Sequence, residues 1–412
     1  MPSFSTSLSG LNANSLALSV IANNLANLST IAYKGMTPIF SDLFYQQVGS
    51  SGSGNPIQVG VGAQVSSIAS PFTQGNIDST GVSTDCAIQG GGFFLVDKDG
   101  MRSYTRAGNF TIDTDGRLVN DEGAFVLGYQ ADNGVISPSQ TLGPLSLASG
   151  QMSAPQATSN VSLSMNLDAA AAVSDNFSTP VVAYDSLGTS HVLTYTFTKS
   201  AANTWDYQIT IPAEDVGATG SPVVVSTGSL TFDGAGKLTA PAADVSGITV
   251  SSLADGANDM SLTWKLYDDH SNPVITQVAG PSATSTTRQD GFSSGTLMDF
   301  SITGDGVING VLSNGQTLAL GQIALATFPN SQGLTRTGSN SFLASLSSGL
   351  PNVGAPGTGG RGTLKGGALE SSNVDIAKEF AQLILAQRGY QANARAITTS
   401  DEVTQEAINL KR

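Results

Sequence analysis

The stretch 191-HVLTYTFT-198 sets the fold class of this 412-residue chain, because its Leu, Tyr and Phe residues alternate with Val and Thr. A period of two is the side-chain period of a β-strand that buries one face. The same alternation recurs in 204-TWDYQITI-211 and 261-SLTWKLY-267. The middle of the chain is therefore predicted to be β-sheet.

Short turn signals separate the predicted strands. An Asp or Asn followed by Gly is the strongest short-range signal for a β-hairpin, because a type I′ turn needs a positive φ at both central residues. Such pairs occur at Asp99-Gly100, Asp115-Gly116, Asn133-Gly134, Asp233-Gly234, Asp305-Gly306 and Asn314-Gly315. Strands joined by tight hairpins are antiparallel, so the sheets are predicted to be antiparallel.

Composition divides the β region into two nested domains. The segment 133–167 carries no charged residue and several prolines, and 279–291 is a similar return crossing. Small-residue stretches at 50–55 and 354–362 lie just inside the two ends and predict flexible connections. The predicted segments are an N-terminal helix (1–30), a linker region (31–70), a β domain (71–145 and 287–358) interrupted by an inserted outer β domain (146–286), a second linker (359–374) and a C-terminal helix (375–412).

The two ends are predicted to be helices that pair as an α-helical coiled-coil domain. Apolar residues at a spacing of three and four form one stripe on each helix, which is the pattern of a coiled-coil seam. Ser372, three residues before Asp375, predicts the start of the C-terminal helix as a capping box. The stripe residues are Leu8, Leu11, Leu18 and Leu25 at the N-terminus, and Ile376, Phe380, Leu383, Tyr390 and Ile397 at the C-terminus.

Charge is scarce in this sequence. Charged residues make up 12% of the chain, against about 25% in a typical soluble protein. The net charge of −14 argues against nucleic acid and against an anionic membrane surface as partners. The first charged residue is Lys34, so no basic region of a cleavable signal peptide precedes it. A helix without charges at the N-terminus is expected to fold only when it packs against a partner.

Motifs for chemistry are weak, and neither an active site nor a cofactor is expected. Cys86 is the only cysteine and is predicted to be a buried apolar residue. His191 and His270 are the only histidines; no ligand is seen at a suitable spacing, so each is expected to be a half-exposed strand or turn residue. The glycines of 357-GTGGRG-362 lack the flanking strand and helix of a dinucleotide site and indicate a linker.

Three separated blocks resemble the bacterial flagellar rod and hook protein family. The block 7–35, SLSGLNANSLALSVIANNLANLSTIAYKG, is similar to the N-terminal signature of that family. AIQGGGFFLVD (87–97) and YTRAGNFTIDTDGRLVNDEGAFVLGY (104–129) resemble its first β domain, and 367–412 resembles its C-terminal helix. The large insertion favours the hook members of the family over the shorter rod members.

The resemblance implies a structural subunit, not an enzyme, that polymerises into a tube and transmits torque. It implies a polymer interface on the nine stripe residues. The partners would be further copies of the chain and the distal rod, hook cap and hook–filament junction proteins. The location would be extracellular, in the flagellum, reached through the flagellar type III apparatus without a cleaved signal peptide. Two alternatives remain: a distal rod component and a secreted β-rich adhesin.

Overall fold

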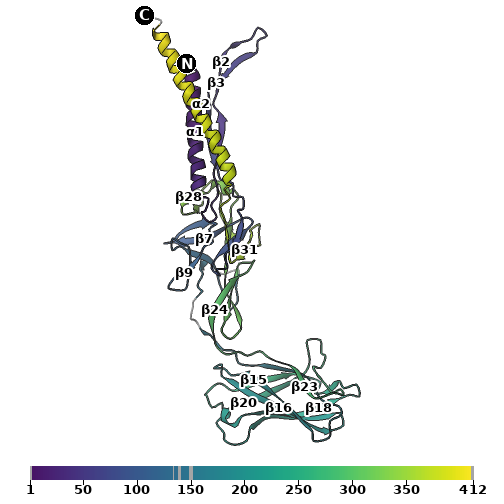
Figure 1. The fold of residues 1–412 in the computed structure, drawn as a ribbon. Helices are drawn as coiled ribbons and strands as arrows, with labels where there is room; N and C mark the ends of the chain where they lie inside the picture. The colour runs from purple at the N-terminus through teal and green to yellow at the C-terminus, as the bar shows by residue number, and fades with distance from the viewer. Residues whose placement is uncertain (1, 133, 138–140, 148–151, 410–412) are drawn as a thin grey trace. The chain divides into compact units, whose positions relative to one another are not determined.

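A computed structural model describes residues 2–132, 134–137, 141–147 and 152–409. The chain forms two compact units, which we call unit 1 and unit 2. Unit 1 comprises Met1–Ser149, Asp299–Val311 and Thr317–Arg412, and unit 2 comprises Gly150–Met298 and Leu312–Gln316. The predicted fold class, mainly β with a pair of terminal helices, is confirmed (Figure 1).

Unit 2 contains two five-stranded sheets. The first is antiparallel throughout, in the order β15 (Asn176–Tyr184), β16 (Ser190–Ala201), β17 (Thr204–Ile211), β18 (Val223–Phe232) and β19 (Leu238–Ala240). The second contains β20 (Val245–Val250), β21 (Met260–Lys265), β14 (Asn160–Asn166), β22 (Ile275–Thr276) and β23 (Ala283–Gln289). Strand β14 runs parallel to β21 and β22, a detail that hairpin signals alone did not predict.

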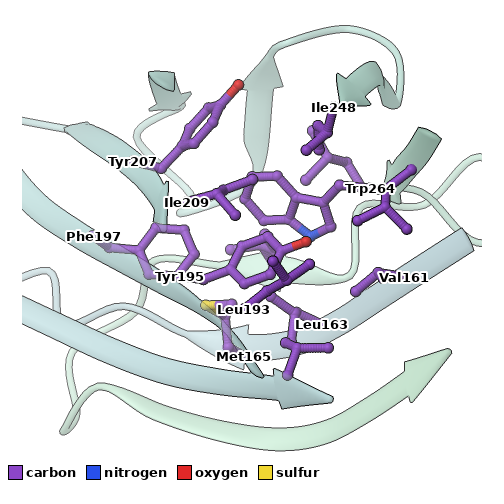
Figure 2. Close-up of a cluster of buried hydrophobic side chains, with 14 of the residues drawn as sticks. Val161, Leu163, Met165, Leu193, Tyr195, Phe197, Tyr207, Ile209, Ile248 and Trp264 are labelled. Atoms are coloured by element: carbon purple, nitrogen blue, oxygen red, sulfur yellow. The ribbon is translucent and has the colours of Figure 1, made fainter. Parts of the chain in front are cut away.

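The core of unit 2 lies on the alternating apolar positions of these strands (Figure 2). The predicted inward residues of 191–198 are all fully buried. The Trp264 ring, from the second sheet, packs edge-on against Tyr195 and Tyr207, with ring centroids 5.2 and 5.1 Å away. Such edge-to-face pairs contribute about 0.5–1.5 kcal/mol beyond the burial of their area. The alternation therefore fixes both the strands and the core that they share.

The β part of unit 1 is built around β6 (Cys86–Gln89), β7 (Phe93–Lys98), β8 (Met101–Thr105) and β11 (Phe125–Gln130). Cys86 is fully buried beside Ile88 and Phe94, as predicted, and burial raises the pKa of its thiol to about 12. The other strands here are β5 (Ile77–Ser79), β9 (Thr111–Ile112), β10 (Leu118–Val119), β12 (Gly143–Pro144), β26 (Thr317–Ile323), β27 (Leu325–Thr327), β28 (Thr335–Gly338), β29 (Ser341–Leu343), β30 (Asn352–Gly354), β31 (Thr363–Gly366) and β32 (Ala368–Glu370).

Three strands belong to the crossings between the units. They are β13 (Met152–Ser153), β24 (Gly295–Ile302) and β25 (Val307–Leu312). The boundary between the units falls within β24 and again within β25. Two short 3₁₀ helices complete the fold, η1 (Ala213–Val216) and η2 (Ser331–Gly333).

The hairpin signals mark turns, but the predicted type I′ geometry is mostly wrong. Only Asp99 and Gly100 both have a positive φ, 54° and 82°. The Asp113 carboxylate accepts hydrogen bonds from the backbone N–H groups of residues 115 and 117, and at Asp115-Gly116 the glycine alone is left-handed. The same holds at 305–306 and 314–315, whereas at 233–236 the left-handed residue is Gly236. Asn133 lies outside the described residues.

The terminal helices lie side by side as α1 (Pro2–Ala26) and α2 (Ile376–Asn409) (Figure 1). The predicted cap was wrong in one detail: Asp375, not Ser372, caps α2. The Asp375 carboxylate accepts hydrogen bonds from the N–H groups of Ala377 and Lys378, at 2.8 and 3.2 Å. A carboxylate at this position satisfies free helix donors and suits the helix dipole.

Residues 37–69, which follow α1 in the sequence and precede β5, form two antiparallel ribbons. One pairs β1 (Thr37–Asp42) with β4 (Ala63–Ala69), and the other pairs β2 (Tyr45–Ser50) with β3 (Pro56–Gly60). The glycine-rich stretch 50–55 is the tip of the second hairpin. Every residue of β2 and β3 is exposed.

Candidate assembly surface

The seam between α1 and α2 is formed by small and amide side chains. A Cβ at Gly10 would lie 2.8 Å from the Asn393 side chain, and a Cβ at Gly389 would lie 2.8 Å from the Asn14 side chain. Each asparagine donates to a glycine carbonyl of its own helix: Asn14 to Gly10 and Asn393 to Gly389. Glycine at these two positions therefore lets the helices approach closely around a symmetric pair of amides.

Below these amides the seam becomes apolar. Ala17, Ile21 and Ala386 are buried together, and Leu18 and Leu383 pack against them. This cluster is small compared with those of the β units. Because most of the stability of a helix comes from its packed face, the seam alone gives the pair little stability.

The nine predicted stripe residues mostly lie outside this seam. None of them is fully buried. Leu8, Ile376, Phe380 and Tyr390 are exposed, and Leu11, Leu18, Leu25, Leu383 and Ile397 are half-buried. The predicted pairing of the two helices is confirmed, but of the stripe residues only Leu18 and Leu383 pack against the seam cluster, and the buried face of α1 within one chain is Ala13, Ala17, Val20, Ile21 and Asn24. Their assignment to contacts between subunits stays a prediction.

Helix α2 exposes further apolar side chains that the spacing argument missed. Ile384 and Leu385 are 54% and 71% exposed, and Ile408 is exposed near the end of the helix. Ile376, Phe380 and Ile384 follow one another at intervals of four, which places them on one face. A constant spacing of four residues from Ile376 predicts this face, whereas a spacing of four and then three leads from Ile376 and Phe380 to Leu383. Contiguous exposed apolar area is typical of an interaction surface.

The two helices are joined to the β part through Asn24. Its amide donates to the Met36 carbonyl at 2.7 Å and to Glu379 Oε1 at 3.2 Å, and its oxygen accepts from the Met36 N–H at 2.8 Å. Asn24 and Glu379 are both buried. One amide thus connects the end of α1, the chain that leaves it and the start of α2.

Lys34, the first charged residue of the chain, is fully buried in an ion pair with Glu370. Its Nζ donates to Glu370 Oε1 at 2.5 Å and to the Thr73 carbonyl at 2.8 Å. The same Glu370 oxygen lies 3.5 Å from Arg106 Nη1 and accepts from the Gly75 N–H at 2.8 Å. Burial lowers the pKa values of Lys34 and Arg106, and Glu370 partly offsets this. We call Lys34, Arg106 and Glu370 the charge clamp.

His191 lies on strand β16, as expected, but is buried instead of half-exposed, and His270 lies in a turn, as expected, and is exposed. His191 is buried in unit 2, with Nε2 at 3.1 Å from Asp185 and Nδ1 at 3.1 Å from Asp215. The signal was invisible in the sequence, because Asp215 is brought close only by folding. His270 is an exposed turn residue whose N–H donates to Asp268. Among the described residues, no helix is long and apolar enough to cross a membrane.

Four family models match the chain, all of them from the bacterial flagellum. They are the flagella basal body rod protein (residues 4–34), the flagellar hook protein FlgE/F/G D1 domain (87–169), the flagellar basal body protein FlaE D2 domain (150–292) and the flagellar basal body rod FlgEFG protein C-terminal region (365–410). The D2 match falls on residues of unit 2, and the two terminal matches fall on α1 and α2 with their flanks.

Whole-length relatives point the same way. The chain is 34% identical to flagellar hook protein FlgE of Treponema pallidum, over 100% of both chains. It is 35% identical to flagellar hook protein FlgE of Escherichia coli, over 99% of this chain and 100% of that one. Its fold is similar to the crystal structure of Helicobacter pylori flagellar hook protein FlgE2, with a TM-score of 0.54 and 16% identity over 71% of this chain and 100% of that one. The chain therefore belongs to the bacterial flagellar hook protein family.

Proposed function

We propose that the chain builds the flagellar hook by polymerising through the exposed apolar faces of α1 and α2. The hook is the flexible joint that transmits torque from rod to filament, and its subunits must bind one another repeatedly in a helical array. The observation that carries this assignment is the apolar face of α2, with Leu385 71% exposed on a helix whose intramolecular seam is small. Heterologous contacts that do not close on themselves produce such a filament.

The nine stripe residues and the newly found Ile384 and Leu385 form the proposed polymer interface. We infer that the helix pair gains most of its order in the polymer, where neighbours cover these side chains. In this arrangement α1, which contains no charged residue, faces other subunits instead of water. Segment 146–286 is the proposed outer domain, and no catalytic role is proposed for either β unit.

Leu385→Ala tests this interface. Full burial of a leucine contributes about 1.5–3 kcal/mol, so its loss should raise the critical concentration for polymerisation about 10- to 100-fold. Leu350→Ala is the matched control, because Leu350 is 87% exposed and lies in the loop between β29 and β30, not on α1 or α2. Sedimentation of polymer from a concentration series measures both. Equal critical concentrations for the two variants would contradict the proposed interface.

The further partners and the route of export are also proposals. Distal rod, hook cap and hook–filament junction proteins would contact the ends of the polymer. Export through the flagellar type III apparatus would leave the N-terminus uncleaved. N-terminal sequencing of extracellular protein checks this: a mature chain that begins beyond about residue 20 would indicate a cleaved signal peptide instead.

A further inference from the structure

Three segments of unit 2 meet around His191. They are the turn between β15 and β16, the short helix η1 and the loop 251–259 between β20 and β21. The Ala254 N–H donates to the Asp215 carbonyl at 2.9 Å, and the Asn258 N–H donates to Ser186 Oγ at 3.0 Å. These hydrogen bonds hold the loop 251–259 against η1 and against the turn between β15 and β16. They place the carboxylate of Asp255, which lies on this loop, beside His191.

Two buried groups supply the first potential ligand atoms. His191 is 4% exposed and Asp185 is fully buried. Asp185 Oδ1 is already occupied, because it accepts hydrogen bonds from the N–H groups of Leu187 and Thr189 at 2.8 and 2.9 Å. Its Oδ2 forms a hydrogen bond of 3.1 Å with His191 Nε2, and an ion bound by both atoms would displace the shared proton. The turn thus fixes one carboxylate oxygen and leaves the other facing the imidazole.

The third ligand atom comes from Asp255, which is exposed. Its Oδ1 accepts from the Ala257 N–H at 3.1 Å. One ligand atom from each of Asp185, His191 and Asp255 lies within 4.8 Å of the other two. In a tetrahedral site with metal–ligand bonds of about 2.1 Å, neighbouring ligand atoms lie about 3.4 Å apart, so a shift of up to about 1.4 Å at the exposed Asp255 completes the set.

The remaining nitrogen of His191 provides an independent observation. Nδ1 is buried and lies 3.1 Å from Asp215 Oδ2, but it makes no aligned hydrogen bond with the described residues. In metal sites the ring nitrogen that does not bind the ion usually donates to a carboxylate, which fixes the tautomer and the ring orientation. Asp215 occupies that position, and a small rotation of the ring toward an ion would align the pair.

We propose that unit 2 binds one divalent transition-metal ion of the zinc class through His191 Nε2, Asp185 and Asp255, with Asp215 orienting the imidazole. An imidazole with carboxylates suits zinc, nickel or copper, whereas calcium and magnesium prefer oxygen ligands alone. Three protein ligands leave a further coordination position for water. The exposed Asp255 provides access from solvent. The ion would join the three segments and stabilise unit 2.

Titration of the chelator-treated, full-length monomer with Zn²⁺ tests the site by calorimetry. One equivalent should bind, and the thermal transition of unit 2 should rise with saturation. Asp255→Asn keeps the oxygen that Ala257 contacts but removes the charge, and should weaken Zn²⁺ binding by at least about tenfold. Asp259→Asn is the matched control, because Asp259 is an exposed carboxylate on the same loop outside the proposed ligand set. The Asp259→Asn variant should bind Zn²⁺ with the same affinity as the parent chain.

Two further variants separate this site from binding elsewhere. His191→Gln should abolish binding and the visible spectrum of a Co²⁺-loaded sample, whereas His270→Gln should leave both unchanged. If His191→Gln does not fold, the comparison of Asp255→Asn with Asp259→Asn still decides the question. Absence of Zn²⁺ binding in the parent chain, or equal binding by the two loop variants, would overturn the proposal. Loss of binding in His270→Gln would place the ion elsewhere and overturn it as well.

Discussion

The charge clamp of unit 1 gives the sharpest prediction about stability, through Glu370→Gln. Glu370 is 1% exposed and faces two buried cations, Lys34 and Arg106. Glutamine keeps the size of the side chain and an oxygen that can still accept from the Gly75 N–H. The substitution therefore removes little except the negative charge.

The expected loss is about 3–5 kcal/mol of the free energy of unfolding of unit 1, because removing one partner leaves buried charge uncompensated. The loss should depend on pH. Burial lowers the pKa of Lys34, and the hydrogen bond that Lys34 donates to Glu370 counteracts this, so the variant lowers that pKa further. Between the lowered pKa and the ordinary value of 10.5, the unfolded chain binds the proton and the folded chain does not. Stability of the variant should therefore rise with pH across this window.

Urea unfolding of the full chain can separate the two units. Both tryptophans, Trp205 and Trp264, lie in unit 2, so their fluorescence reports unit 2 alone. Hydrogen exchange in β7 and β11 reports unit 1. Glu370→Gln should lower the stability reported by exchange and leave the fluorescence transition in place. Glu402→Gln, on the exposed surface of α2, should change neither by more than about 0.5 kcal/mol. A loss below about 1 kcal/mol in Glu370→Gln would refute the assigned role of the clamp.

Three further predictions concern other parts of the chain. Ile21→Ala, in the helix seam, should raise the critical concentration of polymerisation and leave the melting of both β units unchanged; a lowered monomer melting temperature would show that the helices are already stable in the free chain. Trp264→Ala should destabilise unit 2 by about 3–5 kcal/mol in urea unfolding followed by Trp205 fluorescence, and a loss below 1 kcal/mol would contradict the assigned core. Burial raises the pKa of Asp290, but hydrogen bonds from Asn160 and Ser159 outweigh it, so that pKa is lowered. The stability difference between the parent chain and Asp290→Asn should therefore be largest above the ordinary carboxyl pKa and vanish as pH falls through the lowered value; a difference that is constant with pH would exclude this cause.

The strands could be predicted because local pattern and global packing agree in them. In 191–198 the apolar residues that recur with a period of two are buried in the core between the two sheets of unit 2. The sequence of this single strand is therefore enough to predict its buried face. The exact turn type could not be predicted in this way. An Asp-Gly pair fits a type I′ turn, as at 99–100, and also a turn in which the glycine alone has a positive φ, as at 115–116.

The helix seam shows where the pattern misleads. Leucines at a spacing of three and four are the strongest helical signal, but the two helices of one chain approach through Gly10, Gly389 and small apolar residues. Two helices can approach closely only where their residues lack a large side chain. A search for large apolar residues therefore does not find such a seam. His191 and Lys34 were missed for a different reason: their partners are brought close only by folding, from 24 residues away for Asp215 and 336 for Glu370.

The position of its charges explains how so sparsely charged a chain couples its helices to its β part. The charge clamp and the Asn24–Glu379 contact lie at the base of α1 and α2, where both helices join the remainder of unit 1. Small displacements of these buried polar groups are unfavourable, because a buried hydrogen-bond network with unsatisfied groups is less stable than an apolar core. In the interface proposed above, α1 would present an uncharged surface to neighbouring subunits, while directional contacts at residues 24, 34, 370 and 379 fix where each helix leaves the β part.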